Sequence, residues 1–160
     1  MNFQSLSDSD LISSYGDVIK ELKNRKIIRS KNVVGDLGEY LAIEYYNRTP
    51  GLPKLQFAPP GTKNIDAISI NGERYSIKST SSTTTGVFYG LNQPNSNEIE
   101  QQKFEYVIIV VLDENFTLTR INELTWEQFL EYKRWHSRMS AWNLTINKKL
   151  LEHTRTIYKR

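Results

Sequence analysis

The 160-residue sequence contains no cysteine, which excludes disulfide bonds, cysteine-ligated zinc, iron–sulfur clusters and a thiol nucleophile. It has only two histidines, His136 and His153, and they are too far apart in sequence to form a local metal-binding motif. The longest apolar run, residues 107–112, is far shorter than the roughly 20 residues of a membrane-spanning helix. The N-terminus has no basic region followed by an apolar stretch, as a signal peptide would. We therefore expect a cytoplasmic protein that does not bind a membrane.

The overall composition is that of a folded, globular protein. Hydrophobic residues make up 38% of the chain and charged residues 24%. The length predicts one domain over residues 1–160, with a helical N-terminal part over 1–50 that is a candidate dimerisation segment. The net charge of +3, from 21 basic and 18 acidic residues, is compatible with a nucleic-acid partner but does not require one.

Two N-terminal segments have apolar residues at helical spacing. The first spans residues 10–28 and is predicted to be an amphipathic helix that serves packing or dimerisation. Its apolar side consists of Leu11, Tyr15, Val18 and Leu22. The second spans residues 32–47 and is less polar. Its Gly35 and Gly38 lower helix propensity, so we expect them to permit close packing against another element.

Beyond four prolines in residues 48–61, which exclude a further helix, the pattern changes to that of strands. Residues 66–70 and 74–78 alternate around Asn71-Gly72, which predicts a hairpin. The remaining expectations are an irregular polar excursion (79–105), a central buried strand (106–112), an alternating strand (116–121), a helix with a Thr125–Gln128 capping box (126–139), and a tail of strand and loop (144–160). This order predicts an α/β or α+β domain with one mixed sheet.

The predicted hairpin carries the residues best suited to catalysis. Asp66 at its start and Lys78 at its end suit metal-assisted hydrolysis of a phosphodiester. The carboxylate and the Ile77 carbonyl supply the oxygen ligands that Mg²⁺ prefers, and the lysine orients the attacking water and offsets transition-state charge. Mg²⁺ is therefore the expected cofactor.

The register of the hairpin decides whether these residues meet. With a two-residue loop, Asp66 pairs with Ile77 and faces away from Lys78. With a three-residue loop of residues 70–72 and Gly72 in the left-handed conformation, Asp66 pairs with Ser76 instead. Asp66, Ser76 and Lys78 then share one face, so the proposed chemistry requires the second register.

These residues resemble the PD-(D/E)xK nucleases, and within that superfamily the PvuII-type restriction endonucleases. The pattern Asp-Ala, Gly, Tyr and Lys-Ser is present without gaps as Asp66-Ala67, Gly72, Tyr75 and Lys78-Ser79. The strand pair that follows, the Leu-x-x-x-x-Phe helix and the closing Glu152-His153-x-x-x-Ile157-Tyr158 are also similar. The resemblance covers residues 60–160, whereas the first 60 residues share only the helical layout.

The resemblance implies a restriction-endonuclease-like fold, with a mixed sheet flanked by helices. It implies a Mg²⁺-dependent type II restriction enzyme that cuts a palindromic site in double-stranded DNA as a homodimer, one active site for each strand. A cognate DNA methyltransferase encoded separately is a further implied partner. The catalytic and DNA-binding part spans residues 64–160.

The sequence departs from the family at one position. Where the family has Asp or Glu two residues before the lysine, this chain has Ser76, whose hydroxyl is a poor Mg²⁺ ligand. Glu39, an acid flanked by apolar residues on the second helix, is the candidate replacement as a catalytic residue and metal ligand. The other candidate, Glu73, lies at the hairpin tip, too distant from Asp66 to serve.

DNA contacts are expected from two polar segments. In the excursion after Lys78, amide side chains suit adenine recognition and hydroxyl groups suit bases or phosphates. Residues 91–93 stand roughly where the family has DNA-contacting histidines, which implies a different target sequence. The basic tail offers phosphate contacts. The candidate DNA-binding residues are Thr84, Thr85, Tyr89, Asn92, Gln93, Lys148, Lys149 and Arg155.

Two alternatives to a restriction enzyme follow from the same residues. Because Ser76 removes an acid, the chain is also compatible with a DNA-binding protein whose nuclease fold is catalytically degenerate. A nuclease of DNA repair or junction resolution is the other alternative. Ordinary structural roles also remain open for the polar loop and the basic tail.

Overall fold

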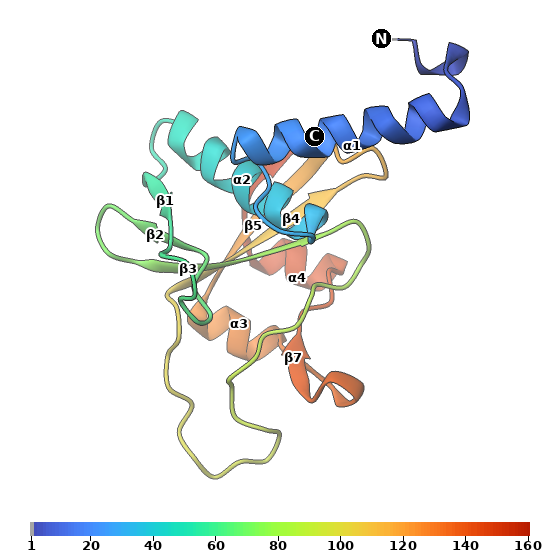
Figure 1. Ribbon diagram of the computed structural model, residues 1–160. Helices are drawn as coiled ribbons and strands as arrows, with labels where there is room; N and C mark the ends of the chain where they lie inside the picture. The colour runs from blue at the N-terminus through green and yellow to red at the C-terminus, as the bar shows by residue number, and fades with distance from the viewer. Residues whose placement is uncertain (1) are drawn as a thin grey trace.

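A computed structural model describes residues 2–160 (Figure 1). The elements in chain order are η1 (Phe3–Ser5), α1 (Asp8–Asn24), α2 (Val33–Arg48), β1 (Leu55–Phe57), β2 (Ala67–Ser69), β3 (Arg74–Thr80), β4 (Tyr106–Leu112), β5 (Leu118–Thr125), α3 (Trp126–Tyr132), β6 (Arg134–His136), η2 (Ser137–Met139), β7 (Ala141–Asn143), α4 (Lys148–His153) and β8 (Arg155–Lys159).

A six-stranded mixed sheet forms the centre of the molecule. Its strand order is β1-β2-β3-β4-β5-β8, while β6 and β7 form a separate hairpin. Neighbouring strands of the large sheet are antiparallel except β3 and β4, which are parallel. Strand β4 lies in its interior and spans the residues 106–112 predicted for a central buried strand. The predicted mixed α+β architecture with one main sheet is therefore present.

Helices cover both faces of this sheet (Figure 1). On one face, α2 packs through Ala42, Ile43 and Tyr46 onto a core that includes Ile108 and Val110 of β4. On the other face, α3 and α4 contribute to a second core, which contains Phe88, Phe104, Val107, Ile109, Leu124, Trp126, Phe129, Leu144 and Leu150. Adjacent β4 side chains thus enter different cores, as the period of two in a strand requires.

Close packing of α2 on β3 depends on Gly38. A Cβ atom built at this position would lie 1.7 Å from the Ser79 hydroxyl oxygen and 2.4 Å from the Ser79 Cβ. No side chain larger than hydrogen fits at such a separation without moving the helix. The close packing expected of Gly38 is therefore found, and it brings the next residue, Glu39, near the β2–β3 hairpin.

The β2–β3 hairpin has the three-residue loop that the proposed chemistry requires. Ala67 pairs with Tyr75, and the Ser69 N–H donates to the Glu73 carbonyl oxygen over 2.9 Å. Gly72 has a φ of +88°, the left-handed conformation that glycine adopts without steric cost. The second of the two possible registers, the one that the proposed chemistry requires, is therefore the one observed.

The predicted helix over residues 126–139 is wrong in its second half. The capping box of Thr125 and Gln128 is present, but α3 ends at Tyr132. The chain turns at Lys133, whose ammonium lies 3.3 Å from the centroid of the Trp142 ring. The next three residues form β6, which pairs with β7. Pairing with a later segment therefore overrides the helical preference of this stretch.

Other differences from the sequence predictions concern short elements. Strand β1 lies within the proline-rich stretch, where prolines on either side of it suit an edge strand. The alternating strand predicted over 116–121 is β5 and continues to Thr125. The C-terminal tail contains a short helix, α4, in addition to the expected strand. The Asn147 side chain caps this helix by accepting the Leu150 N–H over 3.0 Å.

Helix α1 lies at the periphery of the molecule, and none of its residues is buried (Figure 1). Its predicted apolar side is present but uncovered: Ile12 is 72% exposed, and the neighbouring Leu11, Tyr15 and Val18 are also exposed. No helix within residues 2–160 is both long enough and apolar enough to cross a lipid bilayer.

Candidate active site

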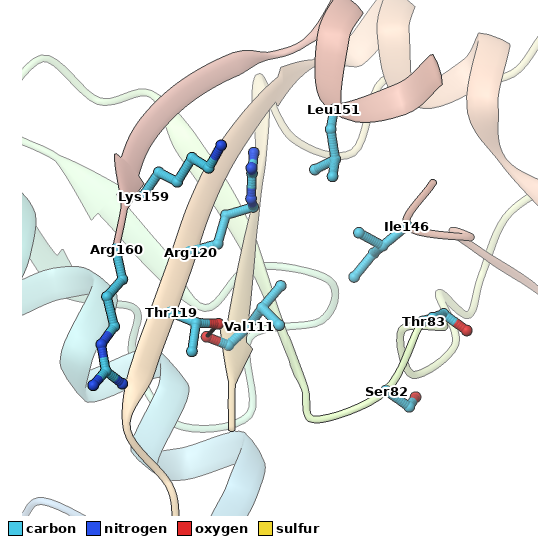
Figure 2. A pocket seen from close by; sticks show the side chains of 9 residues that line it. All are labelled: Ser82, Thr83, Val111, Thr119, Arg120, Ile146, Leu151, Lys159 and Arg160. Atoms are coloured by element: carbon cyan, nitrogen blue, oxygen red, sulfur yellow. Dashed lines mark hydrogen bonds between the residues drawn. The ribbon is translucent and has the colours of Figure 1, made fainter. Parts of the chain in front are cut away.

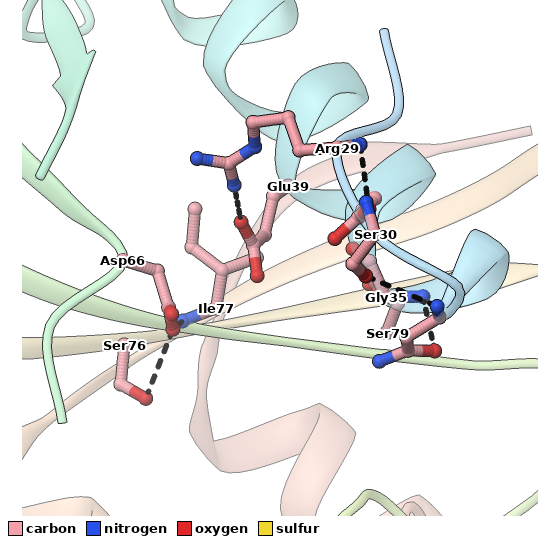
Figure 3. Close-up of polar contacts among 10 residues, drawn as sticks. Arg29, Ser30, Gly35, Glu39, Asp66, Ser76, Ile77 and Ser79 are labelled. Carbon is pink, nitrogen blue, oxygen red and sulfur yellow. Dashed lines mark hydrogen bonds and ion pairs between the residues drawn. The ribbon is translucent and has the colours of Figure 1, made fainter. Parts of the chain in front are cut away.

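Asp66 lies where β2 and β3 separate, immediately before the first paired residue of β2. Its carboxylate accepts the Ile77 N–H over 2.7 Å and contacts the Ser76 hydroxyl at 3.5 Å (Figure 3). Strand β3 continues beyond this point without β2 beside it. The Asp66 side chain therefore takes the place of a strand partner and is held at an open part of the β3 edge.

The Ile77 carbonyl is available at the same edge. In an extended strand, the N–H and C=O of one residue point to the same side. Because the Ile77 N–H points to Asp66, the Ile77 carbonyl oxygen also points toward the side from which β2 has departed. A carboxylate oxygen and a backbone carbonyl oxygen thus face the same open side of β3.

Glu39 approaches this edge from α2. Figure 3 shows its side chain extending from the helix toward Asp66 and Ile77. The side chain is only 18% exposed. Burial, and secondarily repulsion by the Asp66 carboxylate, raise the pKa of Glu39 to about 7. The two acids are therefore close enough to affect each other, the arrangement expected if Glu39 supplies the carboxylate that Ser76 does not.

Ser76 itself is fully enclosed, at 1% exposure, and contributes a hydroxyl next to Asp66. Lys78, two residues further along β3, is partly buried, with its ammonium 5.0 Å from the centroid of the Phe88 ring. Phe88 belongs to the core on the face opposite α2. The positive charge of Lys78 lowers the Glu39 pKa, against the larger effect of burial. The site thus has acids from the α2 side and the sheet edge, and a lysine from the other face.

Arg29 is the residue of this site that sequence reasoning missed. Its guanidinium forms an ion pair with Glu39 (Figure 3) and stacks over the Phe57 ring of β1, 4.2 Å from the ring centroid. Arg29 precedes α2 in an irregular segment, and neither periodicity nor a motif links it to Glu39. The contact arises only when the chain folds, so the sequence alone carried no specific signal for it.

The donor set fits a magnesium ion. Mg²⁺ is bound in proteins through one or two carboxylates together with carbonyl oxygens, water and substrate phosphates. Asp66, Glu39 and the Ile77 carbonyl provide two carboxylates and one carbonyl. Within residues 2–160 there is no cluster of three or more His, Asp or Glu side chains of the kind that forms an all-protein metal cage. Asp66, Glu39 and the Ile77 carbonyl leave the remaining positions of an octahedral ion to water or substrate.

The polar excursion after β3 is anchored to the C-terminal region. Isolated bridges join Thr84 to Thr145 and Phe88 to Trp142, giving a narrow ribbon. Thr85 is only 5% exposed, and its hydroxyl accepts the Leu144 N–H and donates to the Gly86 carbonyl. The expectation that Thr85 contacts DNA therefore needs correction, because its side chain holds the ribbon together.

The other loop candidates differ in how free their side chains are. Tyr89 is 57% exposed, Gln93 is exposed, and Thr84 is partly covered. The Asn92 amide donates to the Glu98 carbonyl oxygen over 3.1 Å, and the Asn92 carbonyl accepts the Trp142 indole N–H over 2.8 Å. Asn92 therefore shapes the loop, whereas Tyr89 and Gln93 extend from it.

The basic candidates of the tail lie away from the acids. Arg155 begins β8, three strands from β3, or about 14 Å at the usual strand spacing. It lies 3.4 Å from the carboxylate of Glu123, which in turn accepts the Tyr46 hydroxyl over 2.7 Å. Lys148 and Lys149 are exposed at the start of α4, and Lys148 lies 3.7 Å from Glu152. These residues do not join the acid–lysine site.

A separate hollow lies beside β5, β8 and α4 (Figure 2). It measures about 450 Å³ and adjoins a second hollow of about 520 Å³. Lys148 lines the second hollow but not the first. Arg120 and Lys159, directly paired across β5 and β8, give one wall a positive charge, while Ile146 and Leu151 form an apolar wall. Neither Asp66 nor Glu39 lines either hollow, so the candidate active site is the open sheet edge.

No protein-family model matches the chain, and no curated protein matches it significantly.

Proposed function

We propose that the protein is a Mg²⁺-dependent endonuclease that hydrolyses phosphodiester bonds of double-stranded DNA, with a restriction-endonuclease-like fold. The observation that carries this proposal is the approach of Glu39 to Asp66 at the open edge of β3. Glu39 supplies the second carboxylate of the site, which the family has at the position of Ser76. Lys78, the basic residue of the site, comes from β3, the same strand as the Ile77 carbonyl.

The chemistry assigns a distinct role to each group. Asp66, Glu39 and the Ile77 carbonyl hold the metal ion. When bound, Mg²⁺ neutralises the non-bridging phosphate oxygens and lowers the pKa of a coordinated water. Lys78 orients the attacking water and offsets the negative charge that grows on the phosphate. The Ile77 N–H fixes the Asp66 carboxylate over 2.7 Å, which limits its reorientation between turnovers.

We further propose that the enzyme is a type II restriction endonuclease that acts as a homodimer through α1. The apolar side of this helix, including Leu11, Tyr15 and Val18, is uncovered in one copy of the chain. Residues 8–17 carry three aspartates and no base, whereas residues 18–26 carry four bases and one glutamate. Antiparallel pairing of two copies places a net charge of −3 against +3 at both ends, and a two-fold dimer matches a palindromic DNA site.

Cleavage of supercoiled plasmid DNA in Mg²⁺, with EDTA as the blank, tests the proposal. Wild-type protein is compared with Asp66→Asn, Lys78→Ala and Glu44→Gln. Glu44 is the matched control, because it lies on α2 and pairs with Arg48 outside the site. We expect the wild type and Glu44→Gln to give discrete fragments and the two site variants to give none. Cleavage by either site variant at the wild-type rate would refute its assigned role.

The same assay separates the alternatives. Nicking, or preferential cutting of branched DNA, would indicate a repair or junction-resolving nuclease. Binding of DNA without cleavage would indicate the degenerate nuclease fold. Two observations favour the degenerate nuclease fold. Ser76 offers no charge, and Glu39 is already paired with Arg29. A separately encoded methyltransferase that protects the same site would support the restriction enzyme.

A further inference from the structure

The main chain at Arg29 is fixed to the first turn of α2. Asp36 is a buried residue of that turn, and its carboxylate accepts the Arg29 N–H over 2.7 Å as well as the Ser30 N–H. The preceding residue, Ile28, is 1% exposed. Arg29 is thus attached to the same helix that carries Glu39, and its position relative to the acid pair does not depend on a mobile loop.

The Arg29 guanidinium is held on two sides and open on the rest. One face lies on the Phe57 ring, and one edge pairs with Glu39. The side chain is nevertheless 41% exposed. A guanidinium has five N–H donors in a rigid plane, and one carboxylate uses two at most. Several donors therefore remain for another acceptor, such as a phosphate bound to the site.

The charges around Glu39 make this ion pair competitive with a metal ion. Two other acids, Asp66 and Asp36, raise the Glu39 pKa, and Arg29 together with Lys78 lowers it. Arg29 is the partner in direct contact. A cation that binds between Glu39 and Asp66 must share or displace this contact, because both cations are attracted to the same carboxylate oxygens.

We propose that Arg29 is the resident counter-ion of the acid pair: it holds Glu39 before metal arrives, yields it to Mg²⁺, and then donates to a phosphate of the bound DNA. This inference rests on the proposed function, since it takes Glu39 and Asp66 as metal ligands. Phe57 keeps the guanidinium in place during the exchange, so Arg29 changes partner without leaving the site.

The test is Arg29→Gln, measured without catalysis. Mg²⁺ binding is followed by calorimetry in the absence of DNA, and binding of a fluorescent DNA duplex with hydrolysis-resistant phosphorothioate linkages is followed at saturating Mg²⁺. Removing the competing charge should tighten Mg²⁺ binding about tenfold, the size of a one-unit pKa effect from a neighbouring charge. Losing a phosphate contact should weaken DNA binding several-fold and reduce the salt slope by about one. Tighter metal binding with weaker DNA binding is a combination that general damage to the fold would not produce.

The matched control is Arg48→Gln, which removes another arginine that pairs with a glutamate of α2, 2.7 Å away and outside the site. It should leave Mg²⁺ binding unchanged. In a Glu39→Gln background, Arg29→Gln should no longer tighten Mg²⁺ binding, because the shared carboxylate is gone. Unchanged or weaker Mg²⁺ binding by Arg29→Gln would overturn the inference, as would an equal gain in both backgrounds.

A second variant covers the case in which Arg29→Gln does not fold. Phe57→Leu removes the aromatic surface but keeps the arginine, so it should weaken DNA binding at saturating Mg²⁺ and leave the metal-free ion pair in place. Wild-type DNA binding by Phe57→Leu would contradict the part assigned to the stacked guanidinium. Failure of the proposed function has a different result: wild-type protein that binds Mg²⁺ no better than the Asp66→Asn, Glu39→Gln double variant.

Discussion

Helices α1 and α2 follow each other in the chain and have similar lengths, 17 and 16 residues, but their surroundings are opposite. Helix α2 buries Ala42, Ile43 and Tyr46 against the sheet, whereas α1 buries no residue. Both were predicted from apolar residues at helical spacing. The comparison teaches that periodicity identifies a helix and its apolar side, while the element that covers that side is decided elsewhere in the chain.

The largest expected difference between the two helices concerns their glutamates. Glu39→Gln on α2 should slow DNA cleavage by at least about 100-fold, because an amide brings no charge to the metal or the transition state. The reference is Asp66→Asn, which should be as severe. Glu21→Gln on α1 removes an acid that pairs only with exposed Arg25, so it should leave cleavage unchanged. Single-turnover rates in Mg²⁺ measure both, and similar rates for Glu39→Gln and wild type would exclude Glu39 from the site.

The same pair should differ in its effect on the pH dependence of stability. The pKa of Glu39 is raised from 4.5 to about 7 by burial, so the folded protein retains a proton that the unfolded chain releases. Without metal, the stability from this group is fully present below about pH 4.5 and is lost as pH rises through about 7. The loss is on the order of 3 kcal/mol. Urea unfolding of Glu39→Gln should lack this fall, which Glu21→Gln should retain.

Glycine to alanine substitutions should have opposite signs in the two helices. In α2, the added methyl of Gly38→Ala meets Ser79 and should cost about 1–3 kcal/mol of unfolding free energy. In α1, nothing lies within 4 Å of the Cβ position of Gly16, so Gly16→Ala should stabilise by roughly 0.5–1 kcal/mol through helix propensity. Gly38→Ala should also reduce cleavage, because it moves Glu39. A stabilising Gly38→Ala would show that α2 and β3 are not in close contact.

The smallest effect on folding should come from the uncovered side of α1. Ile12 is 72% exposed in one copy, so Ile12→Asp should change the unfolding free energy of the monomer by no more than about 0.5 kcal/mol. It should nevertheless shift the mass measured by light scattering from dimer to monomer, because a carboxylate would enter the proposed antiparallel contact. Ser13→Asp, with a comparable charge at an exposed polar position, is the control. A dimer that survives Ile12→Asp would remove α1 from the interface.

The parts of the site that the sequence could predict are those specified locally. Asn71-Gly72 and the alternating residues around it predicted the hairpin and limited its register to two possibilities, of which the proposed chemistry selected the one that pairs Asp66 with Ser76. Glu39 could be named because an acid among apolar residues on a buried helix is costly unless it has a partner. Which partner it has was beyond the sequence, since Arg29 contacts it through an irregular segment. Thr85 looked like a surface residue because the pairing that buries it involves Leu144.

The fold shows the same division. Strand β4 was predicted because a continuous apolar run in a chain of this length belongs in a sheet interior, and the capping box located the start of α3. The end of α3 at Tyr132 could not be predicted, because the following residues pair with β7 and Lys133 packs on Trp142. Strand β1 was hidden among prolines. Its partner, β2, is what makes three residues of that segment a strand.

The ribbon that joins the excursion after β3 to the C-terminal region has a consequence for the order of folding. Its hydrogen bond between Thr85 and Leu144 joins residues 59 positions apart, whereas the β2–β3 hairpin closes over a three-residue loop. Contacts between distant residues form more slowly because more chain entropy is lost before they are made. In pulse-labelling hydrogen exchange during refolding, we expect the Ser69 amide to gain protection before those of Thr85 and Phe88. The edge that carries Asp66 would then be assembled before the ribbon, which cannot form until residues 142–145 have been synthesised.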